Sequence, residues 1–361
     1  MALCESDPEV TDVLRLQYPN TQLVRDVRTF SPPRVDLVAG GWPCQDISVA
    51  GQQAGLSGLK SRLLIDMLRV AQKAKASTVV AENVPNLLRM NAGLEFTGSL
   101  QAFHDYGYRF VAWRVMNARS FGLPQHRNRI LLVASTEKER IYPLFRSLPR
   151  LSNEQTSPAK RGLAAGFYWT AGIHSLNYSR GYVPTIKVGS SLNIASPPAV
   201  HIGATVRQLT PVEALRLQGF EIEIGGFSSA KAALRAAGNA VPRPMGRWLM
   251  DGILGEDQAF HEFSTQESLF HEWSFSSGIG ESSRHPKMGI SIDGAISPVK
   301  IRASGDQSTN LIDYLDSGDH PSLSRRAATG LLERLARSGQ PCPEDLRDVL
   351  EGISSRDQES A

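Results

Sequence analysis

A cysteine stands where a strand of small and apolar residues ends. Residues 35–41 form that strand, and Pro43, Cys44 and Gln45 follow its glycine pair. In open α/β sheets, ligands bind at the carboxyl ends of the strands. Two more polar groups, at residues 82–84 and 125–129, lie beside later apolar segments. Three such groups in series indicate an enzyme whose site lies along one edge of a sheet.

The fold class follows from the pattern of the first 150 residues. Short apolar segments alternate there with segments of helical period, which is typical of an α/β fold with a mainly parallel sheet. Asp7 and Pro8 predict the start of a helix, and residues 63–71 an amphipathic helix. Residues 111–115 and 130–134 are expected to pair as neighbouring strands.

Composition excludes several classes of protein. The 361 residues carry a net charge of only +3, which permits a nucleic-acid partner without requiring one. Three scattered cysteines fit neither a disulfide framework nor a metal cluster, so we expect a reducing compartment and no metal. No apolar run is long enough to cross a membrane, and the N-terminus lacks the pattern of a secretion signal. We therefore expect a cytoplasmic protein without membrane contact.

The residues at the strand ends have open interpretations when each is taken alone. Cys44 is either a small buried hydrophobe or a nucleophile activated by nearby backbone N–H groups. Glu82 is either a solvated loop residue or a proton-transfer group kept partly dry. Arg127 and Arg129 alternate along one strand, and at least one should point inward toward a carboxylate or phosphate.

Taken together, these groups resemble the C5-cytosine DNA methyltransferases of the bacterial and phage restriction-modification type. The Pro-Cys-Gln, Glu-Asn-Val and Gln-x-Arg-x-Arg motifs of that family match residues 43–45, 82–84 and 125–129 in the same order. Residues 207–220 and 238–241 complete the set, so the resemblance covers about residues 1–254. An ordered set of this kind is far more specific than any single motif.

The resemblance implies a chemistry for these residues. Cys44 would attack C6 of a cytosine flipped out of duplex DNA, and Glu82 would hold and protonate N3. Arg127 would anchor the carbonyl side of the base, and Arg129 would brace Glu82. The implied methyl donor is S-adenosyl-L-methionine, and the cofactor residues implied are Glu5, Asp26, Val27, Pro43, Leu63, Asn239, Ala240 and Val241.

The resemblance also implies a double-stranded DNA substrate and a domain organisation. The DNA-contacting residues expected are Gln45, Ser48, Arg180, Lys187 and Arg207, and residues 46–62 should be a loop that closes over DNA. The expected parts are a catalytic and cofactor domain (1–135 and 205–254), a small target-recognition region (136–204), a partly disordered linker (255–320) and a C-terminal helical hairpin and tail (321–361) that we expect to be a solvated appendage.

One departure from the family leaves alternatives open. The first strand and Phe-x-Gly-x-Gly loop of the family precede the point where this chain begins, so we expect a methyltransferase (Rossmann-like) sheet truncated at its N-terminus. The competing hypotheses are a catalytically silent DNA-binding remnant, or a subunit whose missing motif comes from a separate chain. A tRNA-methylating relative ranks last, because the loop around Cys44 looks closer to that of the DNA enzymes. A cognate restriction endonuclease is the other partner that the resemblance implies.

Overall fold

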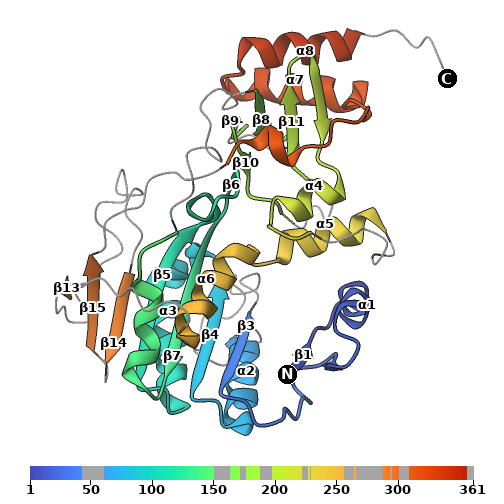
Figure 1. Cartoon of the computed structure of the whole chain (residues 1–361). Coiled ribbons are helices and arrows are strands. Elements are labelled where there is room, and N and C mark those ends of the chain that lie inside the picture. Colours follow the sequence, from blue (N-terminus) through green and yellow to red (C-terminus); the bar gives the residue numbers. More distant parts are fainter. Residues whose placement is uncertain are drawn as a thin grey trace. The chain divides into compact units, whose positions relative to one another are not determined.

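The computed structural model of the chain divides into two compact units (Figure 1). The first comprises residues 1–117, 128–148 and 246–305, and the second comprises residues 118–127, 149–245 and 306–361. This division follows packing, whereas the expected domain boundaries follow motifs, so those boundaries stay a prediction. The residues that the structure describes are 1–42, 61–149, 163–170, 176–187, 197–221, 227, 229–255, 264–265, 288–292, 295–300 and 309–355.

A seven-stranded sheet is the centre of the first unit. The strand order is β13-β15-β14-β5-β7-β4-β3, and β3 pairs with β4 in parallel. Strand β7 is antiparallel to both β4 and β5, so β3, β4 and β5 run in the same direction and confirm the expected pairing of residues 111–115 with 130–134. The strands are β3 (Leu37–Gly41), β4 (Thr78–Asn83), β5 (Phe110–Asn117), β7 (Asn128–Ser135), β13 (Ser264–Thr265), β14 (Met288–Ile292) and β15 (Ala295–Lys300).

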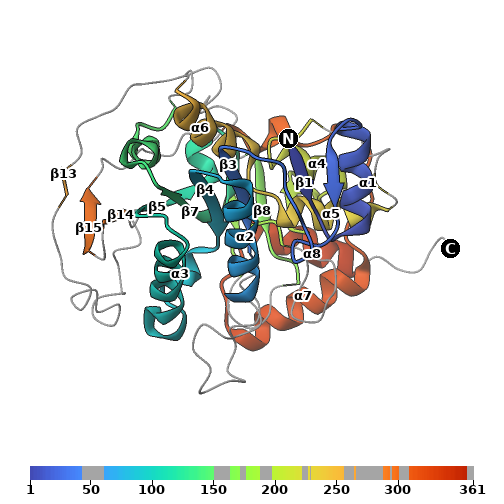
Figure 2. The ribbon, with the colours of Figure 1, turned by 90° about the horizontal axis from the view of Figure 1, so that it is seen from below.

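Helices cover both faces of this sheet, as the turned view shows (Figure 2). Helices α2 (Ser61–Ala74) and α3 (Leu94–Asp105) pack on one face, where Leu68 and Phe103 are fully buried against β4 and β7. Helix α6 (Arg243–Leu254) and the 3₁₀ segment η4 (Lys138–Phe145) belong to the other face. A sheet buried on both sides explains the nearly continuous apolar run of β7.

A small parallel pair of strands stands apart from the large sheet. Strands β1 (Ala2–Cys4) and β2 (Gln22–Val24) pair in register, with helix α1 (Pro8–Gln17) between them. Asp7 caps α1 by accepting hydrogen bonds from two backbone N–H groups, and Pro8 occupies the first turn. The predicted start of this helix is therefore confirmed.

Three described strands, β13, β14 and β15, lie inside the range that we expected to be a linker. Strand β14 pairs antiparallel with β5, and β15 pairs with β14. The prediction of a linker is wrong for these residues. The signal was the alternation of Ile290, Ser291 and Ile292, which is a strand pattern too short to stand out in a segment rich in serine and glycine.

The second unit is built on a four-stranded antiparallel sheet of order β12-β11-β8-β9, beside a short parallel pair β6-β10. Its strands are β6 (Gln125–His126), β8 (Ala164–Phe167), β9 (Ser179–Arg180), β10 (Val183–Pro184), β11 (Ala199–Ile202) and β12 (Thr205–Gln208). Its described helices are α4 (Pro211–Arg216), α5 (Ala230–Asn239), α7 (Arg325–Ser338) and α8 (Glu344–Ser355), and its described 3₁₀ segments include η3 (Ala118–Phe121) and η9 (Leu311–Tyr314).

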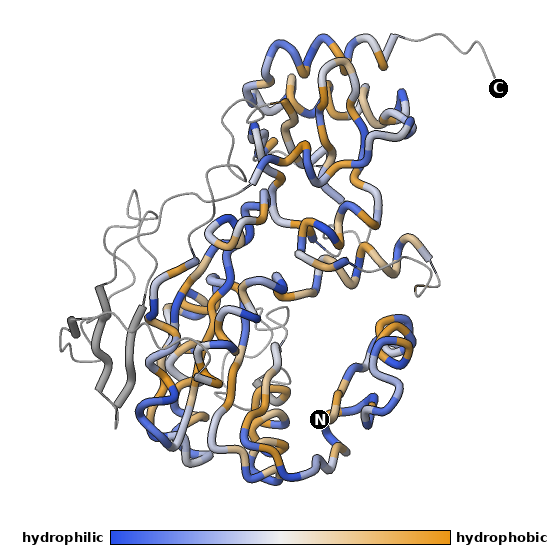
Figure 3. The backbone as a smooth tube through the Cα atoms, in the orientation of Figure 1, coloured by the Kyte–Doolittle hydropathy of each residue, from blue (hydrophilic) through white to orange (hydrophobic). Residues whose placement is uncertain are grey.

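The C-terminal hairpin of α7 and α8 forms part of the core of this unit. Figure 3 shows that hydrophilic and hydrophobic residues alternate along both helices. This pattern is typical of a helix that buries one face. Leu331 and Leu350 are buried in one cluster with Phe167 of β8 and Val206 of β12. The hairpin is therefore not a solvated pair of helices, because its apolar face covers the sheet.

Among the described residues, no helix is both long and apolar enough to cross a membrane.

Candidate active site

The register of β3 and β4 brings the first two sequence motifs to one edge of the sheet. Gly41 at the end of β3 is the direct partner of Glu82 at the end of β4. A Cβ atom on Gly41 would lie 2.9 Å from Oε2 of Glu82, which is closer than real contacts allow. Glycine at position 41 is therefore required so that the Glu82 carboxylate can lie against the β3 backbone.

Asn83 joins the same two strand ends. Its side-chain amide donates to the carbonyl oxygen of Trp42 at 3.1 Å, and its own Oδ1 accepts from the N–H of Val84 at 2.8 Å. Both Asn83 and Trp42 are buried. The chain is thus fixed two residues before Cys44. Pro43, Cys44, Gln45 and Ser48, and most of the predicted closing loop, lie outside the described residues.

Arg129 holds the carboxylate of Glu82. Its Nε lies 2.7 Å from Oε1, and the two side chains are 11% and 17% exposed. The pair comes from neighbouring antiparallel strands, β7 and β4. A guanidinium beside a partly buried carboxylate fixes the direction of that carboxylate. The structure thus contains the contact that the resemblance implied for Arg129, while the role of the pair in catalysis stays a prediction.

Arg127 has different surroundings from Arg129, although only one residue separates them. Its buried guanidinium belongs to the second unit and donates to the carbonyl oxygens of Ile186, Gly238 and Ala240 at 3.0, 2.9 and 2.6 Å. These bonds hold the end of α5, where Asn239 begins the predicted cofactor segment 239–241. The contact of Arg127 with a base stays a prediction.

Gln125 supports the same backbone from the other end of the motif. Its Nε2 donates to Leu217, and its Oε1 accepts from the N–H of Ile186. Gln125 is fully buried, so both halves of its amide are used inside the second unit. Sequence reasoning missed these structural roles of Gln125 and Arg127, because side chains that bind distant carbonyls leave no local pattern.

The predicted cofactor acids of the first unit follow paired parallel strands. Glu5 follows β1 and Asp26 follows β2, and the N–H of Glu5 donates to the carbonyl of Val24. Asp26 pairs with Arg28 at 2.7 Å, and this hydrogen bonding lowers the pKa of Asp26 to about 2. Two acceptor side chains at neighbouring strand ends fit the hydroxyl and amino donors of a nucleoside. These acceptors match the donors of S-adenosyl-L-methionine, and the exposed Arg28 side chain would have to leave Asp26 for the adenine amino group to bind there.

The loop that follows Asp26 is held by helix α2. Nη2 of Arg69 donates to the carbonyl oxygens of Val27 and Arg28 at 2.9 and 2.7 Å. Leu63, in the first turn of the same helix, is partly buried against the core. One helix thus carries one predicted cofactor residue and fixes the backbone of another.

The predicted DNA-contacting residues of the second unit have unequal surroundings. Lys187 is exposed, and Arg180 is exposed in an ion pair with Asp345 at 2.7 Å. Arg207 is only 3% exposed, and both of its Nη atoms bind the carboxylate of Glu213 at 2.9 and 2.7 Å. A buried and paired guanidinium is not available to DNA, so the prediction for Arg207 is corrected: it is a structural residue.

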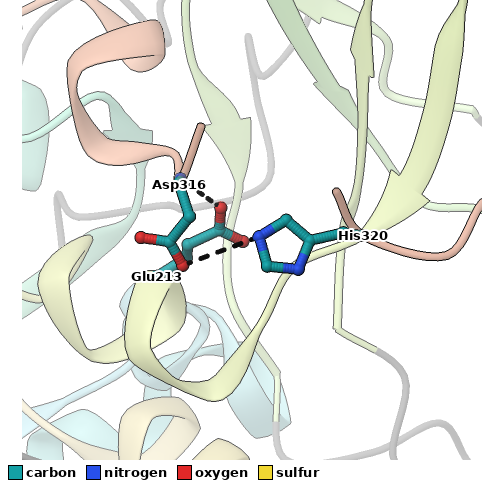
Figure 4. A group of neighbouring side chains, drawn as sticks. All are labelled: Glu213, Asp316 and His320. Carbon is teal, nitrogen blue, oxygen red and sulfur yellow. Dashed lines mark hydrogen bonds and ion pairs between the residues drawn. The ribbon is translucent and has the colours of Figure 1, made fainter. Parts of the chain in front are cut away.

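Glu213, Asp316 and His320 place three potential metal ligands together, the one such group found in the described part of the chain (Figure 4). Each oxygen of Glu213 already accepts two hydrogen bonds, from Arg207, from the N–H of Thr210 and from the N–H of Asp316. A cation would have to displace these donors beside a guanidinium charge. The group therefore suits a structural junction better than a metal.

Comparisons with known proteins agree with the motifs. Residues 1–165 match the family model described as C-5 cytosine-specific DNA methylase. The type II methyltransferase M2.BsuMI of Bacillus subtilis is 32% identical over 351 residues, which cover 92% of this chain and 87% of that protein. The type II methyltransferase M.NlaIV of Neisseria lactamica is 31% identical over 166 residues, 43% of this chain and 37% of that protein.

A solved structure, the S. pombe Dnmt2 methyltransferase, matches with a TM-score of 0.45 and 12% identity over 71% of this chain and 90% of that chain. A similarity of this size does not by itself separate one α/β family from another. The match to M2.BsuMI over nearly the full length of both proteins does so. The chain belongs to the family of C-5 cytosine-specific DNA methylases.

Proposed function

We propose that this chain, a DNA cytosine-5-methyltransferase by family, methylates a cytosine that is flipped out of duplex DNA and attached covalently to Cys44. The observation that supports it most is the Glu82 carboxylate, held by Arg129 at 2.7 Å and facing Gly41 at the end of β3. Cys44 follows Gly41 by three residues in the sequence. In the sequence, the thiol therefore follows the strand that pairs with the Glu82 strand.

The proposed cycle begins with attack of the Cys44 thiolate on C6 of the cytosine. As the S–C6 bond forms, the electrons of the C5=C6 double bond move to C5, and Glu82 donates a proton to N3 to offset the developing charge. Arg129 keeps Glu82 directed at N3. S-adenosyl-L-methionine, when bound, supplies the methyl group for C5. Loss of the C5 proton to water then restores the C5=C6 double bond as the S–C6 bond breaks and releases the thiolate, and N3 returns its proton to Glu82.

The residues proposed to hold the cofactor are those that the family motifs imply. Glu5 would accept hydrogen bonds from the ribose hydroxyls, and Asp26 from the adenine amino group. The Asp26 carboxyl is ionised at neutral pH, so it can accept this hydrogen bond. The remaining residues would line the site through apolar contact and backbone groups: Val27, Pro43, Leu63, Asn239, Ala240 and Val241.

DNA is the substrate that the family implies, and its proposed contacts are Gln45, Ser48, Arg180 and Lys187. The names of the relatives support a place in a type II restriction-modification system, with a cognate endonuclease as partner. The motif-based domain boundaries remain part of this proposal, with target recognition in residues 136–204.

A covalent trapping experiment tests the mechanism. The full chain is incubated with S-adenosyl-L-methionine and duplex DNA that contains 5-fluorocytosine, and the products are separated under denaturing conditions. Fluorine at C5 cannot leave as a proton does, so we expect a stable protein–DNA adduct. Cys44→Ser should abolish it, whereas Cys4→Ser and Cys342→Ser, which change the other two cysteines, should not. An adduct that survives Cys44→Ser would overturn the mechanism.

A second outcome separates the enzyme from its alternatives. Binding of the same DNA with no adduct from the unaltered chain would favour a silent DNA-binding protein, or a subunit that needs a separate chain. Glu82→Gln should still bind DNA and should slow adduct formation by about 100-fold, the range expected for loss of a general acid.

A further inference from the structure

His126 is held at the surface by the two buried residues beside it. Gln125 and Arg127 are fully buried and bonded inside the second unit, and side chains alternate along an extended segment. The His126 side chain is accordingly exposed. Thr185 Oγ1 donates to the carbonyl of His126 at 2.7 Å, which fixes the backbone as well. The position of this imidazole is therefore set by the same motif that carries Arg129.

Tyr182 brings a cation to the same place. The Cζ atom of Arg119, from η3, lies 3.9 Å from the centre of the Tyr182 ring. The His126 ring meets the Tyr182 ring edge to face, with centroids 6.3 Å apart. The pKa of His126 is lowered, mainly by partial desolvation and to a smaller extent by the charge of Arg119. The second cause agrees with a guanidinium close to the imidazole.

A second pair repeats this arrangement a few residues further along. Nζ of Lys187 lies 4.3 Å from the centre of the Tyr168 ring, and the Tyr168 hydroxyl donates to the carbonyl of Thr185. Thr185 thus bonds both to His126 and to Tyr168. The two cation–ring pairs share one backbone segment, residues 182–187, and we name Arg119, His126, Tyr168, Tyr182 and Lys187 the basic-aromatic strip.

The chemistry of the strip indicates its ligand. A cation resting on an aromatic ring is held in place by the ring and presents its N–H groups at its edge. Arginine and lysine side chains positioned in this way are typical ligands of phosphate oxygens. Two cations held on rings in this way, with an imidazole beside Arg119, suit the phosphates of a nucleic-acid strand.

We infer that the basic-aromatic strip binds the phosphate backbone of the substrate DNA, with Arg119 and Lys187 as phosphate ligands and Tyr182 and Tyr168 as their positioning residues. The inference rests on the proposed function for the identity of the substrate. Arg119, His126, Tyr168 and Tyr182 thereby gain a role that their sequence context did not suggest.

The salt dependence of DNA binding tests the ligands. The full chain and its variants are titrated against a 30-base-pair duplex of randomised sequence at several salt concentrations. Each phosphate contact contributes about 0.9 to the slope of log K against log salt concentration. Arg119→Gln and Lys187→Gln should each reduce the slope by about one, and the double variant by about two. Arg325→Gln and Arg326→Gln, which change exposed arginines of α7, should leave it unchanged.

The positioning role of Tyr182 has its own readout. Tyr182→Leu should weaken binding several-fold, and Tyr182→Phe should restore it, because the ring supports the guanidinium without its hydroxyl. Unchanged slopes in Arg119→Gln and Lys187→Gln, or equal losses in the α7 controls, would overturn the inference. So would tighter, strip-dependent binding of stem-loop RNA than of duplex DNA. Cys44→Ser, which should abolish the adduct, should keep the full slope, so failure of the strip and failure of the mechanism are distinguishable.

Discussion

The buried pair Arg207–Glu213 provides the sharpest test of how the second unit is held together. The change is Arg207→Met, which replaces the aliphatic part of the side chain with another unbranched apolar chain and removes the guanidinium. The Glu213 side chain is fully buried and the Arg207 side chain is 4% exposed. Arg207 supplies two of the four hydrogen bonds to the carboxylate, together with its neutralising charge. Removing one partner of such a pair costs about 3 to 5 kcal/mol, because the other charge stays buried.

Hydrogen exchange localises this loss. The N–H groups of Ala214 and Leu217 donate within α4, to the carbonyls of Thr210 and Glu213. Each 1.36 kcal/mol corresponds to a factor of about ten. If these amides exchange through opening of the unit, their exchange should therefore become roughly two to nearly four orders of magnitude faster. Amides of β7 in the first unit provide the internal reference.

Arg216 offers the matched control on the same helix. It pairs with Asp316 at 3.0 Å, but the two side chains are 38% and 31% exposed. Arg216→Met should therefore cost about 0 to 1 kcal/mol. Adding Glu213→Gln to Arg207→Met removes the stranded charge and should recover more than about 1 kcal/mol. Equal effects of Arg207→Met and Arg216→Met would refute the reasoning from burial.

Three further changes have expected outcomes. Gly41→Ala should lower kcat about tenfold or more, because the new Cβ displaces the Glu82 carboxylate, whereas Gly352→Ala meets nothing within 4 Å and should leave kcat unchanged. Leu331→Ala, at 1% exposure in the α7–α8 core, should cost about 2 to 5 kcal/mol in denaturant unfolding of the second unit. Desolvation raises the pKa of Tyr108 from 10.0 to about 12, so stability should fall as pH rises from about 10 to about 12, and Tyr108→Phe should lack that fall in pH-dependent unfolding.

The edge of the sheet that carries the candidate site could be predicted because its signals are local. Glycines, Trp42 and the glutamate–asparagine pair lie within a few residues of strand ends, and the register of β3 with β4 then brings Gly41 to Glu82. The partner of Arg129 was implied by the family resemblance, and the pairing of β4 with β7 accounts for the contact. In each case the local pattern and the tertiary contact point to the same arrangement.

The second unit could be predicted much less well, because its contacts join distant segments. Arg207 looked available for DNA until the fold buried it against Glu213. The hairpin of α7 and α8 was expected to be solvated because the sequence of an amphipathic helix does not identify the surface on which its apolar face packs. Strands β14 and β15 were missed because short edge strands depend on their neighbour β5 more than on their own sequence.

The five residues of the Gln-x-Arg-x-Arg motif show why one sequence pattern can serve both units. Successive alternate positions have different partners: Gln125 and Arg127 bind backbone carbonyls of the second unit, whereas Arg129 binds the Glu82 carboxylate of the first. His126, between the first two, is exposed beside a cation and a tyrosine ring. The bonds from Arg127 to backbone carbonyls fix the backbone of the motif. That backbone in turn determines where the side chains of Arg129 and His126 begin. A change at Arg127 should therefore affect cofactor binding, through the Gly238 and Ala240 carbonyls, even if Arg127 never contacts a base.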